Sequence, residues 1–185
     1  NNIPELLVDP LPRCVGTVSH LILEVLVDQG TDYWLSMESP LKRQWLQSLL
    51  HYHQLPEARW EQAIEQIQTA INNITGDSKG QWVLSNQHAG SVAELALLSC
   101  YGDSVKNRSI DRCFVDDAGD MWIVDYKTST PLADESKQQF IEREIATYRP
   151  QLMDYKLQMS LRDDNSRPIR IALYFTHYPH FEELE

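Results

Sequence analysis

The sequence predicts an α/β fold, in which an N-terminal helical part precedes a core of mixed β-sheet flanked by helices. Two observations carry this prediction. Apolar residues recur at helical spacing as far as about residue 75, and short apolar or alternating runs replace them from about residue 88. The resulting order is helices, three strands, a helix and a further strand, which is typical of one α/β core rather than of two domains.

The length of 185 residues suits one domain that buries a sizeable core. Hydrophobic residues make up 42% of the chain and charged residues 23%, which is the composition of a globular protein rather than of a disordered one. We therefore expect a single domain over residues 1–185, with the helical part at about 12–75 and the core at about 88–178. Because the chain does not begin with Met, we expect it to be a fragment of a longer protein.

The helical part contains three amphipathic segments. Residues 15–28 place their aliphatic side chains on one helical face, and the segment after Pro40 and residues 56–74 repeat this pattern. Pro40 and Pro56 stand where the start of a helix tolerates proline. The glycine-bounded segment 76–80 predicts a loop after the third helix.

The second half of the chain has the periodicity of strands. Residues 116–120 have the composition of a hairpin turn, and residues 131–137 form a polar stretch. The predicted elements are strands at 91–99, 108–115 and 121–127, a helix that begins by Pro150 and continues to about Leu161, and a final strand at 169–175.

The charge of the chain limits the partners that it can hold. The formal net charge is −11, so the chain is not a general polyanion binder. Contact with nucleic acid would need a local site, metal ions or a basic partner. Such a site is compatible with the net charge, since charges beyond roughly 8 Å are screened at physiological salt.

Cysteine usage and hydropathy indicate a cytoplasmic protein without membrane contact. Cys14, Cys100 and Cys113 are odd in number and form no C-x-x-C pair, which argues against a disulfide framework, a zinc finger and a four-cysteine iron–sulfur cluster. We expect reduced and mostly packed thiols. No apolar run approaches the roughly 20 residues of a membrane helix, and no signal peptide is visible.

The predicted hairpin brings two carboxylates together. Alternate side chains share one face of a strand, so Asp125 and Lys127 point the same way. If Val115 pairs with Met121 across the turn, Asp111 lies opposite Asp125. Directly opposed residues have Cβ atoms about 4.5–5.5 Å apart. The sequence therefore predicts two facing carboxylates with a lysine one step along the strand.

Two carboxylates this close repel each other, and one takes up a proton unless a cation relieves the cost. Oxygen-rich sites with open water positions suit Mg²⁺ or Mn²⁺. Lys127 should stay protonated among negative charges, so we expect it to stabilise charge and position water rather than act as a general base. An exposed hairpin with an ordinary Asp–Lys pair explains the same pattern. Ile123 and Val124 favour the first interpretation, because they place Asp125 within an apolar strand.

Five elements that carry polar residues occur in order along the chain. They are Gly16-Thr17-Val18-Ser19-His20, then Glu94, then Ser109-Ile110-Asp111-Arg112, then Ile123-Val124-Asp125-Tyr126-Lys127-Thr128-Ser129, and then Tyr148-Arg149-Pro150-Gln151-Leu152 with Tyr155. Together they resemble the RecB-type nuclease module of the PD-(D/E)XK superfamily, which ends the helicase–nuclease chains RecB and AddA. The resemblance covers residues 16–175 and implies a restriction-endonuclease-like core. Ile110 stands where the superfamily name has Pro, as is usual for the RecB type.

The resemblance implies roles for the acidic residues and for the lysine. Asp111 and Asp125 would bind the metal, and Lys127 would be the catalytic lysine of the D-x-K motif. Glu94 would be the acidic residue of the first core strand. A charge that faces water at a sheet edge also explains Glu94, since a lone acid within an apolar strand is costly.

The resemblance also implies residues that surround this centre. His20 would be a further metal ligand, and the backbone carbonyl of Tyr126 would point at the metal. Tyr148, Gln151 and Tyr155 would match the element that lines the site and contacts DNA. Gln151 and Tyr155 share a helix face by their spacing, although an ordinary amphipathic helix has the same spacing. A structural role equally explains a lone histidine on a helix.

The function that the resemblance implies is that of a Mg²⁺-dependent deoxyribonuclease, with Mn²⁺ as a second candidate metal. In that family the substrate is single-stranded DNA, which helicase domains of the same chain deliver with ATP during double-strand-break repair and recombination. A partner subunit is also implied, whereas an iron–sulfur cluster is not, because the cysteines of the AddB-like branch are absent. Two alternatives stay open. One is an inactive nuclease fold that binds DNA or docks a subunit, and the other is an interaction module whose motif matches are accidental.

Overall fold

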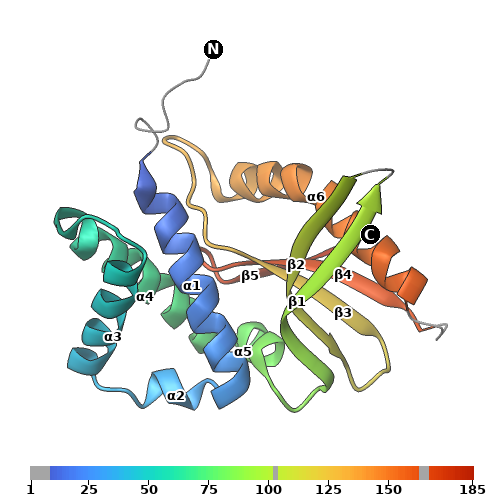
Figure 1. Ribbon diagram of the computed structural model, residues 1–185, viewed down its shortest axis with the longest axis horizontal. Coiled ribbons are helices and arrows are strands. Elements are labelled where there is room, and N and C mark those ends of the chain that lie inside the picture. Colours follow the sequence, from blue (N-terminus) through green and yellow to red (C-terminus); the bar gives the residue numbers. More distant parts are fainter. Residues whose placement is uncertain (1–8, 102–103, 163–166) are drawn as a thin grey trace.

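A helical part lies beside a twisted β-sheet, and one long helix packs over the sheet (Figure 1). The computed structural model describes residues 9–101, 104–162 and 167–185. Asp9 caps the first helix by accepting a hydrogen bond from the Leu11 amide at 3.1 Å. The helical part consists of α1 (Pro10–Gln29), α2 (Asp32–Leu35), α3 (Ser39–Tyr52), the 3-10 turn η2 (Glu57–Arg59), α4 (Trp60–Gly76) and α5 (Ser78–Leu84).

The five-stranded sheet has its strands in sequence order. They are β1 (Ala89–Tyr101), β2 (Ser104–Val115), β3 (Met121–Lys127), β4 (Ile169–Phe175) and β5 (His180–Leu184). β3 and β4 are parallel and are joined by the crossover helix α6 (Lys137–Arg162), whereas the other neighbouring pairs are antiparallel. The predicted α/β fold, with a mixed sheet flanked by helices and an N-terminal helical part, is confirmed.

Apolar side chains cover both faces of the sheet. On one face, residues of α1, α3, α4 and α5 pack against Trp122 and Val124 of β3. On the other face, α6 covers Ile123 together with residues of β4. Because side chains alternate along a strand, Asp125 and Lys127 belong to the α6 face. The neighbouring Tyr126 packs with the helical part.

α6 begins at Lys137, well before Pro150, which was the latest start that the sequence predicted for this helix. The first turns bury Phe140 and Ile141 among exposed polar residues, which leaves almost no amphipathic pattern to detect. Pro150 lies inside the helix, where it lacks the amide of an internal hydrogen bond. β5 was not among the elements predicted from the sequence. Leu184 of β5 is in fact buried.

The loop predicted at residues 76–80 is largely the start of α5. The side chain of Asp77 caps this helix by accepting a hydrogen bond from the Gly80 amide at 2.9 Å. A Cβ atom at Gly80 would lie 2.1 Å from the Ile74 carbonyl oxygen. Glycine is therefore needed here for the close approach of α5 to α4, and it does not mark a loop.

α1 corrects the expectation that no apolar run approaches the length of a membrane helix. It is long and apolar enough to cross a membrane by length and composition, with a mean hydropathy of 1.3, but half of that window is buried inside the structure. Val18, Ile22 and Leu26 of α1 are fully buried in the core between the helical part and the sheet. Helices at the centre of a core pass the same test, so the finding is weak evidence for a membrane span.

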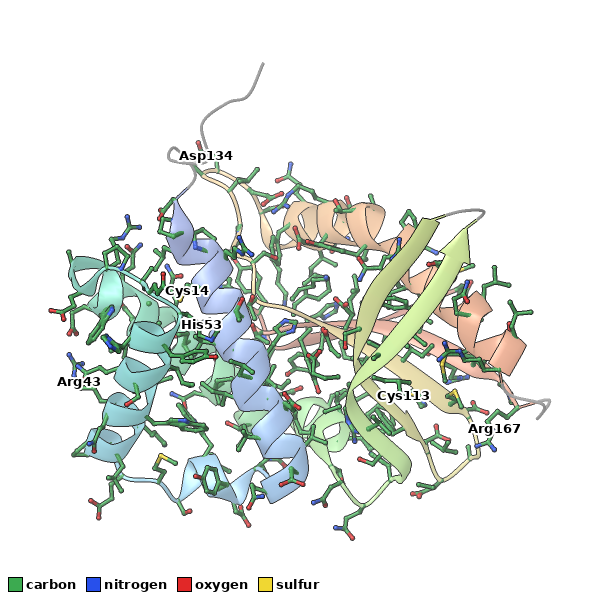
Figure 2. The ribbon with its side chains drawn as sticks, viewed as in Figure 1. Cys14, Arg43, His53, Cys113, Asp134 and Arg167 are labelled. Carbon is green, nitrogen blue, oxygen red and sulfur yellow. The ribbon has the colours of Figure 1, made fainter. Side chains whose placement is uncertain are left out.

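Two cysteines lie in separate parts of the core. Figure 2 shows Cys14 on the helical side of the molecule and Cys113 on the sheet, well apart from each other. Both are buried free thiols. Burial raises the pKa of Cys113 to about 11, so this thiol is protonated and unreactive at neutral pH. The side chain of Cys100 lies outside the described residues.

Arg112 is a fully buried cation on β2, and it fastens the segment between α5 and β1. Its guanidinium donates to the carbonyl oxygens of Val83 at 2.8 Å and Ser85 at 2.7 Å. It also donates to the hydroxyl of Ser91 at 2.9 Å and to the carbonyl of Val92 at 3.2 Å. Arg112 is therefore part of the scaffold and has no access to a phosphate group.

We expect Arg112→Met to lower the free energy of unfolding by about 2–4 kcal/mol, because several buried carbonyl oxygens lose their donor. Urea denaturation measures this change. Arg149→Met is the matched control, since Arg149 is exposed and donates only to the carbonyl of Glu185 among the described residues. An unchanged urea midpoint for Arg112→Met would show that the buried cation does not hold this segment.

Candidate metal centre

His20, Glu94 and Asp111 converge at one point in the structure. Each offers one ligand atom, and these three atoms all lie within 4.8 Å of one another. The residues come from α1, β1 and β2, so the cluster forms only when the helical part packs against the sheet. An imidazole nitrogen with two carboxylates is a donor set that binds divalent cations.

α1 presents His20 to the sheet. The Nδ1 atom of His20 lies 3.4 Å from Oδ1 of Asp111, and its ring meets that of Tyr126 edge-on at 6.0 Å. Leu23 and Val27, on the neighbouring side of α1, are buried as well. The helix is therefore covered on more than its main apolar face, as the interpretation of His20 as a site residue requires.

Asp111 lies where the ladder between β2 and β3 ends. Val115 pairs with Met121, as predicted from the turn, and the ladder continues only to Arg112 and Val124. Asp111 comes next, and its Oδ2 atom accepts a hydrogen bond from the Tyr126 amide at 2.8 Å. The Asp111 carboxylate thus accepts the hydrogen bond that a backbone carbonyl of β2 would accept if the ladder continued.

The same geometry places the Tyr126 carbonyl at this edge. In an extended strand the amide and the carbonyl of one residue point to the same side, and those of the next residue point to the other. The Tyr126 amide points to Asp111, whereas the Lys127 carbonyl accepts from the Thr176 amide at 2.9 Å on the β4 side. The Tyr126 carbonyl is therefore directed toward β2, where the sequence-based interpretation requires it.

Glu94 adopts a strained backbone conformation. Its φ angle is 51°, in the left-handed region that residues other than glycine rarely enter within a strand. Ala93 pairs with Arg112 and Leu95 with Ile110, which places Glu94 across from Asp111. The Ser109 hydroxyl donates to Oε2 of Glu94 at 2.8 Å. Strained residues cluster at functional sites, and this one carries its carboxylate to the cluster.

Asp125 and Lys127 form a pair beside the cluster. The Nζ atom of Lys127 lies 2.5 Å from Oδ2 of Asp125, and their side chains are only 11% and 7% exposed. The same Nζ atom lies 3.1 Å from the centroid of the Tyr148 ring. Asp125 thus faces the lysine, and it is His20, Glu94 and Asp111 that share one point in space. Buried ion pairs contribute little net stability, so this pair is better explained by function than by folding.

Burial and neighbouring charges shift the pKa values of the site residues. Burial, and then the charge of Asp111, raises the pKa of Asp125 to about 6, although Lys127 and His20 act in the other direction. Burial also raises the pKa of Glu94, and the charge of Asp111 adds to this effect. For His20, burial lowers the pKa, but the hydrogen bond and charge of Asp111 outweigh burial and leave the pKa raised. The positive groups near the carboxylates do not balance the negative charge of the site, and a divalent cation would supply the missing positive charge.

α6 brings the other predicted residues to this region. Gln151 donates to the hydroxyl of Tyr155 at 2.8 Å, and that hydroxyl donates to the Ser109 carbonyl at 2.9 Å. Tyr155 is 3% exposed, so it is a buried contact between α6 and β2. Tyr148 lies nearer the site, over the Lys127 ammonium group.

The structure also assigns a contact that the sequence interpretation missed. Ser109 lies within a quoted motif, but its hydroxyl was given no role, and it turns out to hold Glu94. The signal was a hydroxyl residue two positions before Asp111 on the same strand. Its partner could not be predicted, because it depends on the unusual backbone of Glu94.

Cavities flank His20 on both sides. One has a volume of about 430 Å³ and is lined by His20, Asp125, Lys127 and Tyr148, among others. The other has a volume of about 440 Å³ and reaches Glu94 along α1. A larger cavity of about 950 Å³ between α1, α3 and β1 contains none of the clustered residues. The ionisable groups therefore line open space that a substrate can enter.

Comparison with known proteins adds nothing to this picture. No protein-family model matches the chain, and no curated protein sequence matches it either. The functional argument therefore rests on the geometry of the site and on the chemistry of its residues.

Proposed function

We propose that the chain is a metal-dependent nuclease domain that hydrolyses phosphodiester bonds in single-stranded DNA. The observation that carries this proposal is the meeting of His20, Glu94 and Asp111 at one point, beside the buried pair of Asp125 and Lys127. Clustered carboxylates with an adjacent lysine suit the transfer of a phosphoryl group, in which negative charge must be stabilised.

The residues present fit a divalent cation such as Mg²⁺ or Mn²⁺. His20, Glu94 and Asp111 would hold it, with Asp125 and the Tyr126 carbonyl as neighbouring oxygen donors. Burial, and then the charge of Asp111, raises the pKa of Glu94 and of Asp125, and a divalent cation would offset both effects. A bound divalent cation would supply a Lewis acid for the phosphate and a lower pKa for an attacking water.

Lys127 contributes positive charge at the place where a phosphate would approach. Its ammonium group lines the cavity of about 430 Å³, and Asp125 and Tyr148 hold it in position. An ammonium group donates hydrogen bonds and accepts none, so Lys127 can stabilise negative charge on phosphate oxygens. We assign Lys127 to charge stabilisation for this reason.

Hydrogen bonds from neighbouring groups hold the carboxylates in place. The Tyr126 amide orients Asp111, and the Ser109 hydroxyl orients Glu94. Gln151 and Tyr155 fix the backbone at Ser109 from the other side. Such outer contacts keep ligand groups within the narrow limits that catalysis needs.

The net charge of −11 bears on how DNA reaches the site. An acidic domain attracts a polyanion weakly, so it depends on delivery. We propose that helicase domains of a longer chain supply the strand, in the cytoplasm and in the context of double-strand-break repair. Weak DNA affinity of the isolated domain, with a steep dependence on salt, agrees with this arrangement.

Cleavage of an oligothymidylate tests the proposed function. We expect cleavage when Mg²⁺ or Mn²⁺ is present and complete loss of cleavage when EDTA removes the metal, because the carboxylates alone cannot stabilise an attacking water. Gel electrophoresis of a labelled strand measures both. Cleavage that continues at full rate in EDTA would contradict the metal-dependent mechanism.

A further inference from the structure

A groove with neutral polar walls leads away from the site. We define this polar groove by Gln62, Gln66 and Thr69 of α4 and by Thr128 and Thr130 of the loop after β3. It joins two cavities of about 430 and 330 Å³, which share four lining residues. The first cavity contains the ammonium group of Lys127 and the carboxylate of Asp125. The groove is therefore continuous with the proposed catalytic centre.

Hydrogen bonds hold the two walls of the polar groove in place. Asn73 of α4 donates to the carbonyls of Thr176 at 2.8 Å and His177 at 3.1 Å. Thr176 in turn donates from its amide and its hydroxyl to the Lys127 carbonyl, at 2.9 and 3.1 Å. α4, the end of β4 and the loop after β3 are thus linked directly. The groove is a preformed feature of the fold.

The walls offer hydrogen-bond donors that the fold does not use. Gln62, Gln66 and Thr69 are spaced at i, i+4 and i+7, so they share one face of α4. Among the described residues, neither glutamine side chain makes a hydrogen bond, and the same holds for the hydroxyls of Thr128 and Thr130. The core face of α4 carries aliphatic residues instead, so packing does not explain this row.

The charge of the groove favours weak binding that is independent of sequence. Three carboxylates line its two cavities: Asp125 is paired with Lys127, Asp9 is paired with Arg59 at 2.9 Å, and Glu65 is exposed. Amide and hydroxyl donors are common partners of phosphate and sugar oxygens, and such contacts position a strand without reading its bases.

We propose that the polar groove binds the sugar–phosphate backbone of a single DNA strand next to the bond that is cut. This inference rests on the proposed nuclease function and extends it to the path of the substrate. A cavity of about 330 Å³ is at the small end of ligand pockets, which suits one strand rather than a duplex. Gln62 and Gln66 are the residues that hold the strand.

Substrates of two lengths separate this groove from the catalytic centre. The double variant Gln62→Ala/Gln66→Ala is compared with the wild type on an oligothymidylate and on bis(p-nitrophenyl) phosphate, which has no neighbouring nucleotides to occupy the polar groove. We expect kcat/KM for the oligothymidylate to fall about tenfold, as for the loss of two hydrogen bonds to phosphate, with hydrolysis of the short diester unchanged. Gln44→Ala is the matched control, because Gln44 is an exposed glutamine on α3. Glu65→Gln should act in the opposite direction and raise kcat/KM for the long substrate.

Fluorescence anisotropy of a labelled oligothymidylate at low salt provides a readout that is independent of cleavage. Weaker binding by the double variant than by the wild type and Gln44→Ala supports the groove, even if no substrate is cleaved and the proposed function fails. Equal binding, or equal loss on both substrates, overturns the groove and leaves the nuclease function standing if cleavage persists. A larger loss of binding to a duplex than to a single strand in the double variant would also overturn the groove.

Discussion

Asp111→Asn is expected to abolish metal-dependent DNA cleavage, with a loss of at least about 10³-fold in rate, or about 4 kcal/mol. Asp111 is the carboxylate that contacts both His20 and the Tyr126 amide, so it joins α1 to the end of β3. Asparagine retains an oxygen that accepts the amide hydrogen bond, but it lacks the charge that binds a cation. The fold should therefore persist while metal binding is lost.

Thermal unfolding shows whether Asp111→Asn acts on the site alone. The substitution removes a charge that raises the pKa of Asp125 and Glu94, so the melting temperature should stay unchanged or rise. Asp117→Asn is the matched control, since Asp117 is exposed at the tip of the hairpin between β2 and β3. Full activity of Asp111→Asn in a folded protein would show that Asp111 is not a metal ligand.

Lys127→Met is expected to lower kcat for DNA cleavage by about 10²–10³-fold, the usual cost of losing one group that stabilises charge in a transition state. Methionine keeps much of the length and apolar character of the side chain, so contact with the Tyr148 ring should persist. The site loses a positive charge but no metal ligand. Mn²⁺ affinity should accordingly be retained or rise, because Asp125 becomes free of its partner.

The comparison of kcat with Mn²⁺ affinity distinguishes Lys127 from the ligand residues. Lys156→Met is the matched control, as Lys156 lies on α6 and lines neither of the two cavities beside His20. A loss of Mn²⁺ binding in Lys127→Met would mean that the lysine shapes the metal site rather than the charge on the phosphate. Unchanged kcat would remove Lys127 from the mechanism altogether.

The parts of the site that could be predicted depend on regular geometry. The turn composition between Val115 and Met121 set the register of the hairpin, and strand alternation placed Asp125 beside Lys127. Helical periodicity gave the apolar face of α1, whereas the role of His20 was an expectation from the resemblance alone. These relations hold wherever a helix or a strand is regular.

The parts that could not be predicted depend on tertiary contacts or on irregular backbone. Glu94 has a positive φ angle that no local pattern signals, and this conformation directs its carboxylate. Asp125 was expected to face Asp111, and the charge of Asp111 does act on it, but the burial that most raises the pKa of Asp125 depends on tertiary packing. Arg112 is charged in the sequence and fully buried in the structure, since carbonyl groups at the end of α5 and just after it accept its hydrogen bonds. Partners of this kind become visible only in three dimensions.

The central claim is that His20, Glu94 and Asp111 hold a divalent cation, and a calorimetric titration with Mn²⁺ tests it most directly. We predict one saturable site in the wild type and in Asp117→Asn, and loss of that site in Asp111→Asn and in His20→Ala. The result is independent of whether DNA is delivered to the domain. An absence of saturable binding in the wild type, or equal binding in Asp111→Asn, would contradict the account.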